Sequence, residues 1–292
     1  MTVPELSNPD IEKTEVTLGS VPDVVKWASD PKLIPNCDDG YFPGRWLRGQ
    51  SDSSNKLLPR VYRPTFRERA KDQWLDHKWY KVIPDKHKAG VGDLGRQCLN
   101  LERRIFSQFL QAGGHLLERD DDVEAYFLAR HYGLPTQLLD WSTNPLIALF
   151  MAVDGDPSKE GAVFAMDPTA HLRTAEPTLR GILTPGHPHA RHAIKIVVAW
   201  EEIRDDYPPH ILAIRPNTRA GRIERQSSCF TLHSYGAGEA PNPTLRRCKI
   251  PHAAKSEIRS VLSSLGINQF TVYNTLDRLS REFDQAWKIQ EP

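Results

Sequence analysis

The sequence predicts a single α+β domain, in which helices of the N-terminal half pack against a mainly antiparallel or mixed sheet formed largely by the C-terminal half. Apolar residues recur every three or four positions in the first half, as in amphipathic helices, whereas short β-like runs dominate from residue 161 to residue 250. Segregation of helices from strands along a chain is typical of α+β folds. The 292 residues can bury a substantial core, and no internal repeat or linker divides them.

The first elements are expected between residues 21 and 50. Residues 1–19 are polar and are expected to form a flexible N-terminal segment. Residues 21–28 have helical spacing, and Ser20 precedes them as a capping residue. Residues 45–50 predict a short strand, and residues 51–64 a polar loop.

Three further helices are expected between residues 93 and 153. The spacing of apolar residues is most regular from Asp93 to Leu117. Residues 122–131 predict a second helix with acidic residues in its first turn, and residues 145–153 a third with a proline near its start. Residues 65–95 are highly charged and predict a polar surface insertion.

Strands are expected in the second half, followed by two helices. The β-like runs cover residues 161–166, 194–199, 211–214 and 228–233. Residues 248–251 are typical of an edge strand that a proline closes. Helices are expected at 256–265 and 272–283, so that the domain covers residues 20–285 and leaves a tail at 286–292.

Composition narrows the class of protein. The net charge of +1 gives no indication of bulk nucleic-acid binding. No apolar run approaches the roughly 20 residues of a membrane-spanning helix, and the N-terminus lacks the features of a secretion signal. The four cysteines are scattered and have no zinc-ligand spacing, so we expect reduced thiols, no metal site and a cytoplasmic location.

Polar side chains are concentrated just before the helix expected at residues 145–153. Because buried polar groups must find partners, this cluster indicates a functional site. One interpretation is that His131 and Asp140 form an acid–base or substrate-orienting pair. The other is structural: Asp140 caps the following helix, and His131 ends the preceding one. The cluster also contains Tyr132, Trp141, Ser142, Thr143 and Asn144.

Two further segments have side chains suited to a cleft. The guanidinium of Arg48 fits phosphate or carboxylate, and Gly49 lets a ligand or another backbone approach closely; the alternative is an ion pair between Arg48 and a carboxylate such as Asp140. Alternate residues of an extended segment share one face, which is either a cleft wall or solvated: Arg222, Glu224 and Gln226. Phosphate-loop, dinucleotide-fingerprint, metalloprotease and serine-nucleophile motifs are absent from the sequence.

Together these segments resemble the FRG domain over residues 20–285. The resemblance is carried by residues 46–52, 58–63, Glu102, the block 131–149, and Arg222 with residues 226–230. Leu47 stands at the aromatic position that names the family, and Ser227-Ser228 replace its usual glycine. Because FRG domains occur in bacteria, phages and mobile elements, the resemblance implies a phage-defence or toxin-type role.

A weaker resemblance concerns the order of motifs in ADP-ribosyltransferases. These enzymes have an aromatic-Arg-Gly strand, a Ser-Thr-Ser strand and a late turn that ends in a glutamate. The present chain has Arg48, then Ser142-Thr143, then Glu224-x-Gln226 in the same order, although the late motif ends in glutamine. This resemblance implies NAD as a substrate.

Three functions follow from these observations. The first is a nucleotide- or NAD-directed enzyme, of the ADP-ribosyltransferase or NAD glycohydrolase kind, without a resident cofactor. Its catalytic residues would be His131, Asp140, Glu224 and Gln226, and its substrate-binding residues Arg48, Gly49, Gln50, Tyr132, Trp141, Ser142, Thr143, Asn144 and Arg222. Its partner would be a small nucleotide or a macromolecule that it modifies. The second is a non-catalytic nucleotide- or phosphate-recognition module, and the third a nucleic-acid-acting protein.

Overall fold

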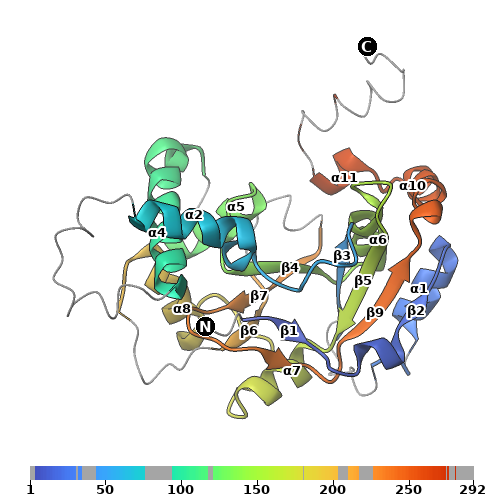
Figure 1. Ribbon diagram of the computed structural model, residues 1–292, viewed down its shortest axis with the longest axis horizontal. Helices are drawn as coiled ribbons and strands as arrows, with labels where there is room; N and C mark the ends of the chain where they lie inside the picture. Colours follow the sequence, from blue (N-terminus) through green and yellow to red (C-terminus); the bar gives the residue numbers. More distant parts are fainter. Residues whose placement is uncertain are drawn as a thin grey trace.

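A mixed sheet forms the centre of the computed structural model (Figure 1), which describes residues 4–30, 32–34, 44–75, 94–117, 121–179, 181–202, 210–216, 226–273, 275 and 280. Its seven strands follow the order β2-β9-β5-β3-β4-β7-β6, and every neighbouring pair is antiparallel except β2 and β9. The strands are β2 (Val16–Thr17), β3 (Trp46–Gln50), β4 (Leu138–Ser142), β5 (Gly161–Met166), β6 (Ile211–Ile214), β7 (Ser228–His233) and β9 (Arg246–Ile250). This arrangement confirms the predicted α+β class.

Helices cover both faces of this sheet. The α-helices are α1 (Val21–Ser29), α2 (Pro64–Leu75), α4 (Leu94–Gly113), α5 (Asp122–His131), α6 (Pro145–Val153), α7 (Pro168–Ala175), α8 (Pro188–Val198), α10 (Lys255–Ser264) and α11 (Gln269–Tyr273). Short 3-10 helices are η1 (Ile11–Thr14), η2 (Arg60–Tyr62), η3 (Gly114–Leu116) and η4 (His252–Ala254). Two very short strands, β1 (Leu6–Ser7) and β8 (Ala240–Pro241), pair outside the main sheet.

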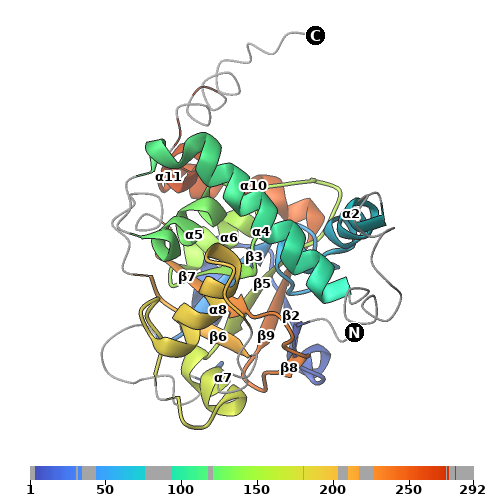
Figure 2. The same cartoon turned by 90° about the vertical axis from the view of Figure 1, so that its left-hand side faces the viewer.

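The alternation of side chains along β5 divides the core into two layers. Phe164 and Met166 belong to the apolar cluster under α4, α5 and α8, whereas Val163 and Ala165 belong to the cluster under α1, α6 and α10. Figure 2 views the molecule from the side on which α4, α5 and α8 lie in front of the sheet. Because both faces are covered, β5 is buried along its whole length.

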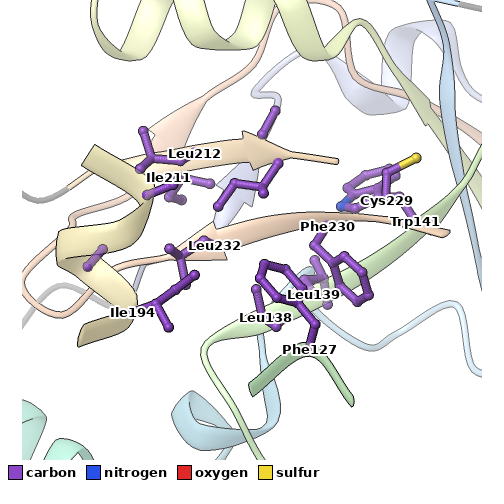
Figure 3. Packing of buried hydrophobic residues seen from close by; sticks show 14 of the residues in the cluster. Phe127, Leu138, Leu139, Trp141, Ile194, Ile211, Leu212, Cys229, Phe230 and Leu232 are labelled. Atoms are coloured by element: carbon purple, nitrogen blue, oxygen red, sulfur yellow. The ribbon is translucent and has the colours of Figure 1, made fainter. Parts of the chain in front are cut away.

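The larger layer is built from side chains of β4, β6 and β7 packed against α5 and α8. Figure 3 shows Phe127 of α5 beside Phe230 of β7, and Ile194 of α8 beside Leu232. The rings of Phe127 and Phe230 meet edge to face with centroids 5.3 Å apart. Burial of each such side chain stabilises the fold by roughly 2 kcal/mol, so this layer anchors the strands that lead to the cavity described below.

Two of the predicted strands differ in the structure. Residues 194–199, expected as a strand, lie mostly in α8, where Ala190, Ala193 and Ile194 face the core at helical spacing. The β-branched run is typical of strands, but tertiary packing overrides that preference. The predicted edge strand at 248–251 was also placed wrongly, because β9 lies between β2 and β5.

Other segments were missed or only partly anticipated. The strand β4 was not expected, since its Asp-Trp-Ser end looked like a helix entrance. The expected surface insertion contains α2, whose Ala70 packs against Cys98 and Leu101 of α4. Within the N-terminal segment expected to be flexible, Leu6 is buried and pairs with Ala240. The predicted helix 272–283 and the tail lie largely outside the described residues.

Gly49 on β3 packs directly against the backbone of α6. A Cβ atom placed on this residue would lie 1.9 Å from the carbonyl oxygen of Ala148 and 2.6 Å from the amide nitrogen of Ala152. Neither backbone atom can move without displacing α6. The sequence suggested that Gly49 lets a ligand or another backbone approach closely. In the structure, the backbone of α6 makes this close approach.

We expect Gly49→Ala to destabilise the protein by about 3 kcal/mol, because the new methyl group must push α6 away from the sheet. Urea unfolding measures the change. Gly113→Ala is the matched control, since a Cβ there meets nothing within 4 Å and should leave stability nearly unchanged. Equal stability of the two variants would contradict the close approach.

Glu102 of α4 is a buried carboxyl group that links three elements. The hydroxyl of Tyr126 on α5 donates to its Oε1, and the side-chain amide of Gln137, next to β4, donates to its Oε2 at 2.9 Å. The backbone amide of Gln137 also donates to Oε1, at 3.0 Å. Burial raises the pKa of Glu102 to about 7 although these hydrogen bonds act in the opposite direction.

This raised pKa predicts that stability falls as the pH rises from about 4.5 to about 7, because the unfolded chain loses the Glu102 proton first. The loss should approach about 3 kcal/mol by neutral pH. Urea unfolding across this range, with Glu102→Gln beside wild type, measures it. The variant should lose most of the pH dependence, whereas Glu257→Gln, at an exposed position, should keep it. Identical pH profiles for wild type and Glu102→Gln would contradict this assignment.

Candidate functional site

A cavity of about 370 Å³ opens between β3, η2, the end of α5 and α11. We call it the arginine cavity, after the four arginines among its described lining residues. These residues are Arg48, Gly49, Gln50, Ser51, Asn55, Arg60, Arg63, Arg130, His131, Gly133, Asp140, Met151, Gln226 and Tyr273. The sequence proposed six of them as site residues, namely Arg48, Gly49, Gln50, His131, Asp140 and Gln226.

Arg48 reaches the cavity from the middle of β3. Its Nη1 donates a 2.6 Å hydrogen bond to the carbonyl oxygen of Asp140 on β4 and lies 3.7 Å from the Asp140 carboxylate. The ion pair expected as one alternative is therefore present. It does not exclude ligand binding, because Arg48 also lines the cavity and its buried Nε has no hydrogen-bond partner among the described residues.

Arg130, in the last turn of α5, donates hydrogen bonds to the Asp140 carboxylate from two nitrogen atoms. Its Nε lies 3.0 Å from Oδ2 and 3.2 Å from Oδ1, and its Nη2 also contacts Oδ2. Such a bidentate pair fixes the planes of both groups. The sharp return of the chain between them passes through Gly133, whose φ of +91° suits glycine.

Arg60 and Arg63 approach from η2 and the residue that follows it. The Nη1 of Arg60 donates to the carbonyl oxygen of Gly133 at 2.6 Å, and the Nε of Arg63 donates to that of Leu58 at 3.2 Å. The sequence pointed to both through the FRG resemblance and through the basic stretch 60–71 of the nucleic-acid hypothesis, but not as residues of this site. Arg130 was missed, because a basic residue in the last turn of a helix is explained by the helix dipole alone.

The electrostatic balance of the arginine cavity is strongly positive. Four guanidinium groups and one carboxylate line it, which leaves an excess of three positive charges on the described lining, apart from His131. Burial, with help from Arg130 and Arg63, lowers the pKa of Arg48 to about 10. Burial and the neighbouring arginines lower the pKa of Arg63 as well. Both groups remain protonated at neutral pH, so the cavity attracts anions.

Asp140 holds this cluster together in its ionised form. Burial alone would raise the pKa of its carboxyl group, but the charges of Arg130, Arg48 and His131 and the hydrogen bonds from Arg130 hold that pKa below its usual value. Asp140 therefore accepts hydrogen bonds from arginines at neutral pH. Its geometry favours a positioning role over that of a general base.

His131, the last residue of α5, lies on the cavity wall. Its ring is largely buried and meets the ring of Phe230 edge to face, with centroids 5.9 Å apart. The strand β7 therefore contributes to the orientation of the imidazole. His131 and Asp140 line the same cavity, as the sequence interpretation requires.

Gln226 closes the cavity on the side of β7. Its Nε2 donates to the carbonyl oxygen of Val272 in α11 at 2.9 Å, and its own carbonyl oxygen accepts from Ser142 Oγ at 2.7 Å. The next residue, Ser227, has a φ of +47°, in the left-handed region that favours glycine. This is where Ser227-Ser228 replace the glycine usual in the FRG family.

The remaining predicted residues serve the fold or lie elsewhere. Asn144, not Asp140, caps α6, so the capping alternative for Asp140 is wrong. Ser142 ends β4 and donates to Gln226, and the backbone amide of Thr143 donates to Ser227. Trp141 is buried and donates to Thr231, and Tyr132 is exposed beside the cavity. Arg222 and Glu224 lie outside the described residues.

Neither metal binding nor membrane crossing is indicated in the described ranges. Histidine, cysteine and carboxylate side chains of these ranges form no cluster of three or more that could hold a metal ion. No helix among them has the length and apolar character needed to cross a bilayer.

We expect Asp140→Asn to lower stability by about 3 kcal/mol at neutral pH, because Arg48 and Arg130 lose their buried counter-charge. A carboxyl group with a lowered folded-state pKa stabilises above its unfolded pKa, so the advantage of wild type should shrink as the pH falls below about 4. Urea unfolding at several pH values tests both points. Asp72→Asn on the exposed side of α2 is the control. A difference between wild type and Asp140→Asn that does not vary with pH would contradict the ion-pair explanation.

Comparison with known proteins identifies one family. Residues 44–161 match the sequence model of the FRG domain, a shorter stretch than the 20–285 expected from the resemblance. No curated protein and no solved structure matches the chain. The matched stretch includes β3, η2, α5, β4 and α6, and with them all four arginines of the cavity. The stretch 44–161 is therefore similar to the FRG domain, and it supplies most of the described lining of the arginine cavity.

Proposed function

We propose that this protein is a nucleotide-directed enzyme that holds the phosphate groups of NAD or a related nucleotide in the arginine cavity. The observation that carries the proposal is the excess of three positive charges on the described lining. Guanidinium groups present fixed pairs of donors that match the oxygen atoms of phosphate. Burial lowers the pKa of Arg48 and Arg63, and repulsion among the arginines lowers it further. An anionic group in the cavity would offset this repulsion.

The size and confinement of the charge favour a small ligand. A volume of about 370 Å³ lies within the range of roughly 300 to 1,000 Å³ typical of small-molecule sites. The whole chain has a net charge of only +1, so the positive charge of the cavity does not reflect a general excess of basic residues. Nucleic acids are usually bound by extended basic surfaces. This distribution supports a nucleotide over a polynucleotide.

The motif order supports NAD among the nucleotides. Arg48, Ser142 and Gln226 lie on β3, on β4 and just before β7, and these three strands are neighbours in the sheet. The motifs that resemble those of ADP-ribosyltransferases are therefore adjacent in space as well as ordered in sequence. In the proposed reaction, the bond between the ribose and the nicotinamide nitrogen breaks, and both electrons leave with nicotinamide.

The acceptor, water or a macromolecule, then adds to the ribose carbon and releases a proton. His131 would orient the ribose from the cavity wall, while Asp140 keeps Arg48 and Arg130 in place for the pyrophosphate. Glu224 and Arg222 keep the roles that the sequence suggests, stabilisation of positive charge on the ribose and phosphate binding.

A non-catalytic recognition module is the second candidate, and one observation favours it. Asp140, the carboxylate among the described residues of the lining, is fully engaged by Arg130 and Arg48. An acid–base reaction needs a group that can exchange a proton near neutral pH. A site whose carboxylate only positions arginines suits binding without turnover.

We expect Arg63→Gln to weaken the binding of pyrophosphate and of NAD by about tenfold, because one charged donor is lost while the Asp140 ion pairs remain. Isothermal titration calorimetry measures both affinities. Arg69→Gln, an exposed position on α2, is the matched control.

The same samples separate the two candidates. Release of free nicotinamide from NAD, followed by chromatography with and without protein acceptors, supports the enzyme. Binding of nucleotides without any turnover supports the recognition module. Failure of wild type to bind pyrophosphate or any nucleotide would overturn both.

A further inference from the structure

We propose that Gln50 recognises a ribose hydroxyl, so that the arginine cavity selects a ribonucleotide over inorganic phosphate or pyrophosphate. This inference rests on the proposed function, because it assumes that the arginines bind the phosphate groups. It adds a substrate class and assigns a specificity role to one side chain.

The side chain of Gln50 is fixed in a buried position at the end of β3. The residue is 6% exposed, and its backbone pairs with Ala162 of β5. Its Nε2 faces the carbonyl oxygen of Lys56, at 3.5 Å. Because a carbonyl oxygen can only accept, this contact assigns the nitrogen of the amide to that side and leaves Oε1 on the other side. That Oε1 is buried and has no hydrogen-bond partner among the described residues.

An unpartnered acceptor on a residue that lines a cavity points to a ligand or a water molecule as its partner. A buried carbonyl oxygen without a partner destabilises a fold, so water or a ligand normally completes such a group. The arginines of the lining only donate hydrogen bonds, and the Asp140 carboxylate already accepts from Arg130. Gln50 therefore offers a ligand hydroxyl a buried acceptor in a lining dominated by donors.

The chemistry of the donor follows from this acceptor. The pyrophosphate bridge of a dinucleotide such as NAD carries no proton near neutral pH, so its oxygen atoms cannot donate a hydrogen bond to Oε1. A ribose hydroxyl is a neutral donor attached to the same ligand. Gln50 and Arg48 are two residues apart on one face of β3, about 7 Å along the strand. One ligand can thus place its phosphate at Arg48 and its sugar at Gln50.

The experiment compares three ligands on three proteins by isothermal titration calorimetry. The ligands are ADP, its 2′-deoxy and 3′-deoxy analogues taken as one class, and inorganic pyrophosphate. The proteins are wild type, Gln50→Met, which keeps the side-chain volume and removes the acceptor, and Gln111→Met, an exposed position on α4.

For wild type, we expect ADP to bind about tenfold more tightly than at least one deoxy analogue. In Gln50→Met this ratio should fall close to one, while the affinity for pyrophosphate stays within about twofold of wild type. Gln111→Met should behave as wild type. If Gln50→Met keeps the same preference for ADP over its deoxy analogues as wild type, the proposed role of Gln50 is overturned.

A second variant guards against a folding defect in Gln50→Met. Gln50→Glu keeps an acceptor at the same place and adds a negative charge beside the arginines. It should keep the preference for ADP over its deoxy analogue while it weakens pyrophosphate. Loss of the preference in this variant would count against hydroxyl recognition. Pyrophosphate binding by wild type without a preference for ADP refutes this inference alone, whereas no binding of any ligand refutes the proposed function.

Discussion

The arrangement of the cavity depends on the ionised carboxylate of Asp140. This one group connects β4 to α5 through Arg130 and to β3 through Arg48. Without it, two buried guanidinium groups would face each other, and Arg63 adds further repulsion. A single negative charge therefore keeps a cluster of positive charges in a defined geometry before any ligand arrives. Such preorganisation reduces what a ligand must contribute in order to bind.

Contacts on both faces of the sheet support this cluster. Gly49 lets α6 lie directly against β3, so the strand that carries Arg48 and Gln50 cannot shift towards that helix. Glu102 ties α4 and α5 to the residue that precedes β4. The two contacts fix β3, α5 and β4, the elements on which Arg48, Arg130 and Asp140 lie. The charges of the cavity thus rest on regular secondary structure more than on loops.

Much of the fold and part of the site could be predicted from the sequence. Helical spacing and capping residues located α5 and α6, and short β-like runs located β5 and β7. These signals are contained in the segments themselves. The strand β4 and the helix α8 were not recognised, since their states depend on packing against distant partners. The same distinction holds for the site. Arg48 was expected from its motif, whereas Arg130 joins the cavity only because the chain folds back at Gly133.

The stretch 44–161 and the later segments contribute different residues to the lining of the cavity. The residues within the stretch 44–161 supply its charge, whereas Gln226 and Tyr273 supply a wall from beyond that stretch. Gln226 is itself tied to Val272 of α11. The later segments therefore contribute to the shape of the cavity but, among the described residues, not to its charge. A protein that shares only the stretch 44–161 would keep the arginines of the cavity, whereas the wall that Gln226 and Tyr273 form here would depend on its later segments.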